Sequence, residues 1–154
     1  MDRRWRDVGV LVAALFAVNV VARLIIRFGF EGDDTAADRV SLAMFAVIGL
    51  ILAVVAFRWA RRRPLAGWGA DMALVVLVAM LLTVLFGPLL IGDNPFAGGA
   101  ATFFAQIWLY LLAAGAGVLV GYLLLTALGR DYRSQQLKRY AEVKAAKPRR
   151  VVRR

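Results

Sequence analysis

The sequence predicts an all-α integral membrane protein: a four-helix bundle with both termini in the cytoplasm and a basic cytoplasmic C-terminal tail. Of its 154 residues, 62% are hydrophobic, and its mean hydropathy is +0.70, whereas soluble domains are about 45–50% apolar. The apolar residues lie in four long runs, and the Lys and Arg residues gather on one side of these runs. A soluble domain of this size would have too little interior to bury so much apolar surface.

Each of the four runs is long enough to cross a hydrocarbon core of about 30 Å. Each is expected to be a helix, because a chain in lipid must satisfy its backbone polar groups internally. The first run carries a row of polar residues, and the second has no charge. The third is expected to end near Pro88, and the fourth is long enough to tilt. The spans are predicted at about 8–28, 40–57, 72–91 and 103–128.

The segments outside the spans differ in charge. Residues 29–39 are acidic, residues 58–71 are basic and broken by Pro and Gly, and residues 92–102 are rich in Gly with a turn-favouring Asn-Pro step. The membrane bundle is predicted to take up residues 1–129. A basic tail follows at residues 130–154, expected to extend the fourth helix and then to become disordered.

The distribution of basic residues predicts the orientation. Seventeen of the 20 Lys and Arg residues lie on one side of the spans, two lie on the other, and Arg23 lies within a span. The positive-inside rule therefore places both termini on the cytoplasmic side of the cell membrane. The first span is expected to remain in the protein, because Arg23 and Arg27 interrupt the approach to a signal cleavage site. Asp71 is interpreted as the cap of the third helix, able to pair with the basic segment before it.

A polar row marks the first span. Asn19, Arg23 and Arg27 are spaced four residues apart, so they share one helix face. In one interpretation, both arginines extend toward the outer surface and pair with the acidic segment. In another, the row faces the bundle interior, where it binds an anion or a lipid phosphate, or it faces a partner protein. Asn19 is near mid-membrane and is expected to hydrogen-bond to another helix. Gln106, in the outer turn of the fourth span, is assigned to the same polar layer.

The fourth span carries a face of small residues. Ala113, Gly117 and Gly121 are spaced four residues apart, and the last two form a GxxxG pattern. Small residues let two helix backbones approach closely. We expect this face to pack within the bundle, and a dimer or partner seam is the alternative.

Basic residues next to the cytoplasmic ends of the spans are expected to contact anionic lipid headgroups. A nucleic-acid partner is not expected, because the chain contains no recognition module. The predicted lipid contacts are Arg61, Arg62, Arg63, Arg130, Arg133, Lys138 and Arg139.

The absence of Cys and His limits the chemistry of the chain. It removes thiolate nucleophiles, the usual general base, the commonest metal ligand and the usual haem ligand. No catalytic residue, metal or cofactor is predicted, and the chain is not expected to be an enzyme. Proton-coupled transport is also disfavoured, because no span holds a deep carboxylate.

Two functional predictions remain. The first is an accessory or scaffold subunit of a larger membrane complex. The alternative is a small oligomeric channel or carrier for an anion or lipid headgroup, using Arg23 and Asn19. The expected partners are anionic headgroups of the cytoplasmic leaflet, together with a membrane protein or further copies of this chain.

Overall fold

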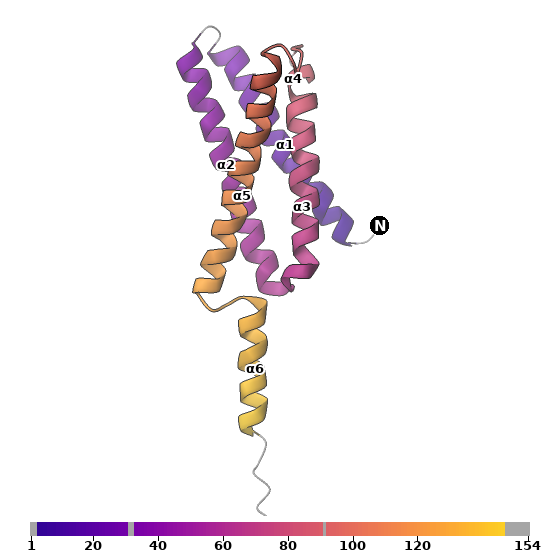
Figure 1. Cartoon of the computed structure of the whole chain (residues 1–154), viewed down its shortest axis with the longest axis vertical. Helices are drawn as coiled ribbons and strands as arrows, with labels where there is room; N and C mark the ends of the chain where they lie inside the picture. The colour runs from indigo at the N-terminus through magenta and orange to yellow at the C-terminus, as the bar shows by residue number, and fades with distance from the viewer. Residues whose placement is uncertain (1–2, 31–32, 91, 147–154) are drawn as a thin grey trace, which may run out of the picture.

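The computed structural model describes residues 3–30, 33–90 and 92–146, and every regular element in these ranges is a helix. Four long helical segments stand side by side, and α6 extends away from one end of the bundle (Figure 1). The elements are α1 (Arg3–Gly29), α2 (Asp34–Arg62), α3 (Leu65–Leu81), the π-helix η1 (Leu82–Phe86), α4 (Gly87–Leu90), α5 (Gly99–Ala127) and α6 (Tyr132–Ala146).

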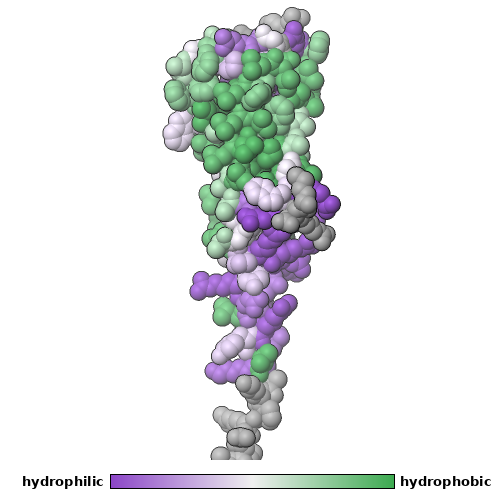
Figure 2. Space-filling model, turned by 90° about the vertical axis from the view of Figure 1, so that its right-hand side faces the viewer, coloured by the Kyte–Doolittle hydropathy of each residue, from purple (hydrophilic) through white to green (hydrophobic). Residues whose placement is uncertain are grey.

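Four helices are long and apolar enough to cross a membrane, judged by length and composition. The third of them is the continuous segment Leu65–Leu90, made of α3, η1 and α4. Apolar residues cover the upper part of the face shown in Figure 2, and polar residues gather toward α6. The predicted all-helical chain with four apolar helices is confirmed, and this pattern indicates a multi-pass membrane protein.

The helices reach further than the apolar runs. α2 begins at Asp34, where the Asp33 carboxylate caps it by accepting hydrogen bonds from the Thr35 hydroxyl at 2.6 Å and the Ala36 N–H at 3.1 Å. These bonds lower the pKa of Asp33 below its ordinary value, and the bond from Thr35 has the larger effect. At its other end α2 continues through the basic segment to Arg62. The predicted basic loop at 58–71 is therefore wrong in extent, because most of its residues are helical.

The tail does not continue the fourth helix directly. α5 ends at Ala127, and Gly129 adopts a positive φ of 60°, a backbone conformation that suits glycine. Asp131 then accepts a hydrogen bond from the N–H of Ser134 at 3.2 Å, and α6 begins. The expected helical extension is instead a separate helix, and the expected disorder of residues 147–154 lies outside the described residues.

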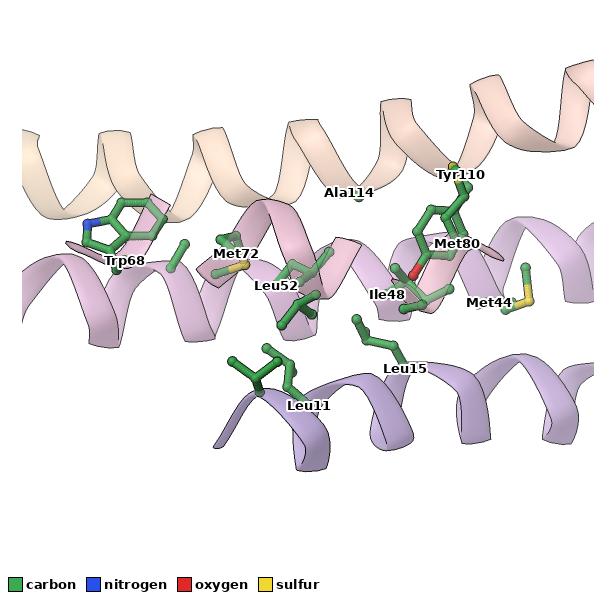
Figure 3. Close-up of a cluster of buried hydrophobic side chains, with 14 of the residues drawn as sticks. Leu11, Leu15, Met44, Ile48, Leu52, Trp68, Met72, Met80, Tyr110 and Ala114 are labelled. Carbon is green, nitrogen blue, oxygen red and sulfur yellow. The ribbon is translucent and has the colours of Figure 1, made fainter. Parts of the chain in front are cut away.

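The core lies along the axis of the bundle and is built from all four long segments. Leu15, Ile48 and Leu52 are fully buried between α1 and α2 and their neighbours. Tyr110 extends from α5 into the same layer (Figure 3). Asn19 is also buried in the bundle, and a buried amide needs hydrogen-bond partners.

Candidate binding site within the bundle

Three predicted polar residues meet at one cavity of about 240 Å³ between α1, α2, η1 and α5. Asn19 and Arg23 come from α1, and Gln106 comes from α5. Ser41 of α2 and Thr83 of η1 add two hydroxyl groups. We call this space the polar cavity. Its apolar lining consists of Ala22, Ile26, Met44, Phe45, Val84 and Leu109.

Asn19 anchors the floor of the polar cavity. Only 1% of its surface is exposed. Its Nδ2 donates to the sulfur of Met44 at 3.1 Å, and its Oδ1 accepts a hydrogen bond from Nε of Arg23 at 3.1 Å. The amide thus links α1 to α2 and holds the guanidinium of Arg23 in place. The link to α2 agrees with the expected bond to another helix.

Arg23 is half-buried and lines the polar cavity. Among the described residues its guanidinium makes one hydrogen bond, to Asn19, and no ion pair. A guanidinium has five N–H donors. A cation in apolar surroundings with four unused donors is costly unless an anion or water reaches it. The charge and donors of the cavity therefore suit an anionic group and disfavour a metal cation.

The two arginines of the predicted polar row have different surroundings. Arg23 hydrogen-bonds through Nε to Asn19, one helical turn back, and forms no ion pair with a carboxylate of the described residues. Arg27 is exposed and does not line the polar cavity. The predicted acidic partners are Glu31, Asp33, Asp34 and Asp38. Asp33 and Asp38 form no ion pair with a described arginine, and Glu31 and the Asp34 side chain lie outside the described residues.

The π-helix shapes the opposite wall of the cavity. Pro88 has no N–H, so it cannot donate to the carbonyl of Val84 as an α-helix requires. The helix widens at this point, and the N–H of Gly87 donates to the carbonyl of Leu82, five residues back. The wider turn places Thr83 and Val84 at the cavity. The helix ends at Leu90, two residues after Pro88, so it ends near this proline as expected.

Because Gly87 has no side chain, the side chains of Asn19 and Arg23 can lie against its backbone. A Cβ on this glycine would lie 2.7 Å from Oδ1 of Asn19 and 2.8 Å from Nε of Arg23. Both separations are shorter than real Cβ contacts. Thr83, on the same wall, is 4% exposed, and its Oγ1 has no hydrogen-bond partner among the described groups. A ligand in the cavity would therefore meet a hydroxyl as well as a guanidinium.

The small residues of α5 face α2. A Cβ on Gly117 would lie 2.7 Å from Cα of Gly49, and a Cβ on Gly121 would lie 2.8 Å from Cα of Ala53. Ala113 is part of the same approach, because its carbonyl oxygen would lie 3.1 Å from a Cβ on Gly49. In the structure this face packs inside the bundle rather than at its surface.

The basic residues at the other end of the bundle separate into groups. Arg61, Arg62 and Arg139 line a second cavity between α2 and α6. The remaining predicted lipid contacts lie outside this cavity. Arg63 is close to Asp71. The other three are exposed, namely Arg130 before α6 and Arg133 and Lys138 on α6.

Asp71 has a role that the sequence did not indicate. It lies two turns inside α3, so it is not the cap that was predicted. It is 3% exposed and accepts hydrogen bonds from Nε of Arg4 at 2.8 Å and from Nη2 of the same residue. Nη1 of Arg63 lies 3.6 Å from its other oxygen, so the expected pairing with the basic segment is present alongside an unexpected one.

Sequence reasoning missed three contributors to the polar cavity. Ser41, Thr83 and Gly87 are common residue types that carry no spacing signal in the sequence. The Gly-Pro pair at residues 87–88 was the available signal, because a proline inside an apolar run marks a place where the helix deviates.

The four apolar helices and the buried polar cluster define the class: a multi-pass helical membrane protein with a polar cavity inside its bundle. No protein-family model matches the sequence, and no curated protein or solved structure matches it either.

Proposed function

We propose that this protein binds an anionic group, a phosphate or carboxylate, in the polar cavity, as a small channel, carrier or receptor would. The observation that carries the proposal is Arg23, a half-buried cation hydrogen-bonded only to Asn19 among the described residues. The Thr83 hydroxyl and the Gln106 amide line the same cavity and can donate to the same ligand. Intramembrane ionisable groups are functional candidates by default.

The test compares two arginines of the same helix. Purified full-length protein is titrated with inorganic phosphate and with glycerol 3-phosphate by isothermal calorimetry, as wild type, Arg23→Gln and Arg27→Gln. Arg23→Gln is expected to weaken binding roughly 10- to 100-fold, because a hydrogen bond to a charged group contributes about 1.5–3 kcal/mol. Arg27→Gln removes the same charge one turn away, outside the cavity, and is expected to bind as wild type does.

A second substitution keeps the charge. Thr83→Val removes one hydroxyl from the cavity at nearly constant volume, and it is expected to weaken binding by a smaller factor than Arg23→Gln. Equal affinity in wild type and Arg23→Gln would overturn the proposal. Acetate is titrated in the same way as a carboxylate probe. The proposal would also be overturned if the wild-type protein bound none of the three compounds.

The proposed orientation places both termini in the cytoplasm and the polar cavity in the outer half of the membrane. The support is the excess of Lys and Arg on one side of the spans. Because the chain has no native Cys, single cysteines can be introduced and labelled. Asp93→Cys should react with a membrane-impermeant maleimide in intact cells, and Lys144→Cys should react only after permeabilisation. The opposite pattern would reverse the orientation.

A second candidate function is an accessory subunit of a larger membrane complex. An apolar groove of about 520 Å³ between α3 and α5 favours it, since Gly69, Ala73 and Gly115 there would let another helix approach. Gly115→Leu would place a large side chain at the groove, and its Cβ would meet no other atom within 4 Å. Gly9→Leu on α1 is the matched control, as it has the same open surroundings.

The subunit hypothesis predicts one stoichiometric membrane protein in a mild-detergent purification, identified by mass spectrometry and native mass. That protein should be lost with Gly115→Leu and kept with Gly9→Leu. A wild-type chain that purifies without any stoichiometric partner would remove this candidate.

A further inference from the structure

A basic cavity of about 560 Å³ lies between the end of α2 and the first turns of α6. We call it the basic pocket. It is about 25 Å along α2 from the polar cavity, taking 1.5 Å per residue from Ser41 to Arg58. Four of its eight lining residues are arginines, and none is acidic. The lining consists of Phe57, Arg58, Arg61, Arg62, Tyr132, Gln135, Gln136 and Arg139.

The basic pocket exists because the chain turns between α5 and α6. Gly129 adopts a positive φ after the end of α5, and α6 then starts beside the end of α2. Gln135 links these helices, since its Nε2 donates to the carbonyl of Arg130 at 2.6 Å and to that of Arg61 at 3.3 Å. The separate helix α6, rather than a continuous extension of α5, thus brings Arg139 to the three arginines of α2.

The charge of the basic pocket has no protein counterpart among the described residues. Both ion pairs among the described residues lie outside the pocket, because they join Asp71 to Arg4 and Arg63. None of the four pocket arginines pairs with a described carboxylate. Four guanidinium groups around one space repel one another, and a bound anion would relieve that repulsion. Their planar donor pairs match the oxygens of a phosphate.

Exposed apolar residues of α2 lead toward one wall of the basic pocket. Leu50 and Val54 are exposed apolar residues, and with Arg58 they follow a four-residue spacing on one face of α2. Phe57 adds an apolar edge to the pocket itself. An acyl chain along Leu50 and Val54 would lead its headgroup directly to the arginines. A soluble phosphate would make no use of this apolar path.

We propose that the basic pocket holds the phosphate headgroup of an anionic phospholipid, with one acyl chain lying along Leu50 and Val54. The site is distinct from the polar cavity, and it binds one lipid in a defined place rather than attracting lipid diffusely.

The test measures lipid retention by the full-length protein in nanodiscs of phosphatidylcholine with added phosphatidylglycerol, using native mass spectrometry. Arg61→Gln/Arg139→Gln removes two charges from the basic pocket. Lys138→Gln/Lys144→Gln removes two charges from α6 outside the pocket. Arg61→Lys/Arg139→Lys keeps the charge and removes the planar donor pairs.

Wild type and the lysine control are expected to retain one phosphatidylglycerol per chain. The double Gln variant in the pocket should lose affinity roughly 30-fold, because each basic side chain beside an anionic headgroup is worth about fivefold. The double Lys variant should fall between wild type and the Gln variant, which also shows that the altered pocket still folds.

Equal retention by the pocket variant and wild type would overturn the proposal. An equal loss in the lysine control would also overturn it, because it would show diffuse attraction. Inorganic phosphate that binds the detergent-purified protein as tightly as the lipid, and only with an intact pocket, would assign the site to a soluble phosphate instead.

Discussion

The close contact between α2 and α5, which we call the α2–α5 seam, can be tested with two glycines of α5. Gly121 faces the backbone of Ala53, whereas Gly115 faces open space. A Cβ on Gly121 would lie 2.8 Å from Cα and from the carbonyl carbon of Ala53, and closer still to its oxygen. Ordinary van der Waals contact for a Cβ begins at 3.4 Å. Gly121→Ala therefore forces the two backbones apart by at least about 0.6 Å, in a core that tolerates little overpacking.

Overpacking of this kind costs about 1–3 kcal/mol. Gly121→Ala is expected to lower the free energy of unfolding by that amount. Gly115→Ala on the same helix has nothing within 4 Å of its new Cβ. It should leave stability unchanged or raise it by up to about 1 kcal/mol, since alanine is the better helix former.

The assay is SDS titration of the purified protein in mild-detergent micelles, followed by far-ultraviolet circular dichroism. Gly117→Ala should behave like Gly121→Ala, because its Cβ would meet Gly49 equally closely. If Gly121→Ala unfolds at the same SDS fraction as Gly115→Ala or later, the α2–α5 seam is not the close contact described above.

Three other changes probe separate parts of the chain. Asp71→Asn leaves two guanidinium groups facing a neutral amide, so the free energy of unfolding should fall by about 1–3 kcal/mol in the same SDS titration; an unchanged value would contradict this role. The hydrogen bonds from the Thr35 hydroxyl and the Ala36 N–H lower the pKa of Asp33. Its cap therefore stabilises α2 at neutral pH, and that stabilisation is lost as the pH falls through the lowered value. The amide ¹⁵N shift of Ala36 should titrate with a midpoint below that of an unperturbed aspartate, and Asp33→Asn should abolish the titration; an ordinary midpoint would refute the cap. Gly87→Ala should weaken phosphate binding without changing net charge, because its Cβ would displace the two side chains that form the polar cavity; calorimetry showing wild-type affinity would count against that site.

Much of the architecture could be predicted because lipid imposes simple rules. Apolar runs of sufficient length had to be helices, and the four long helices lie where these runs are. Helix depth alone was enough to associate Asn19, Arg23 and Gln106, and the structure places them at one cavity. Depth depends only on position along the chain, so a sequence can reveal it.

The sequence was less informative wherever rotation about a helix axis or distance along the chain mattered. Thr83 lies within a π-helix, whose turn is wider than that of an α-helix, and a regular helical pattern does not anticipate such a turn. Arg4 and Asp71 are 67 residues apart, and nothing local connects them. The break at Gly129 was open to prediction, since glycine often follows a helix end and Asp131 with Ser134 resembles a cap.

The bond between Arg4 and Asp71 has a consequence for how the chain assembles. A membrane protein made from its N-terminus produces α1 and α2 before α3 exists. Arg4 can therefore pair with Asp71 only after α3 has been made. The close seam of α2 forms later still, because its partner Gly121 lies in the last of the four long helices. The Arg4–Asp71 ion pair and the close contact of α2 with α5 both need helices that follow α2. A chain truncated after α2 would lack both of them and could keep only the contacts between α1 and α2, such as the bond from Asn19 to Met44.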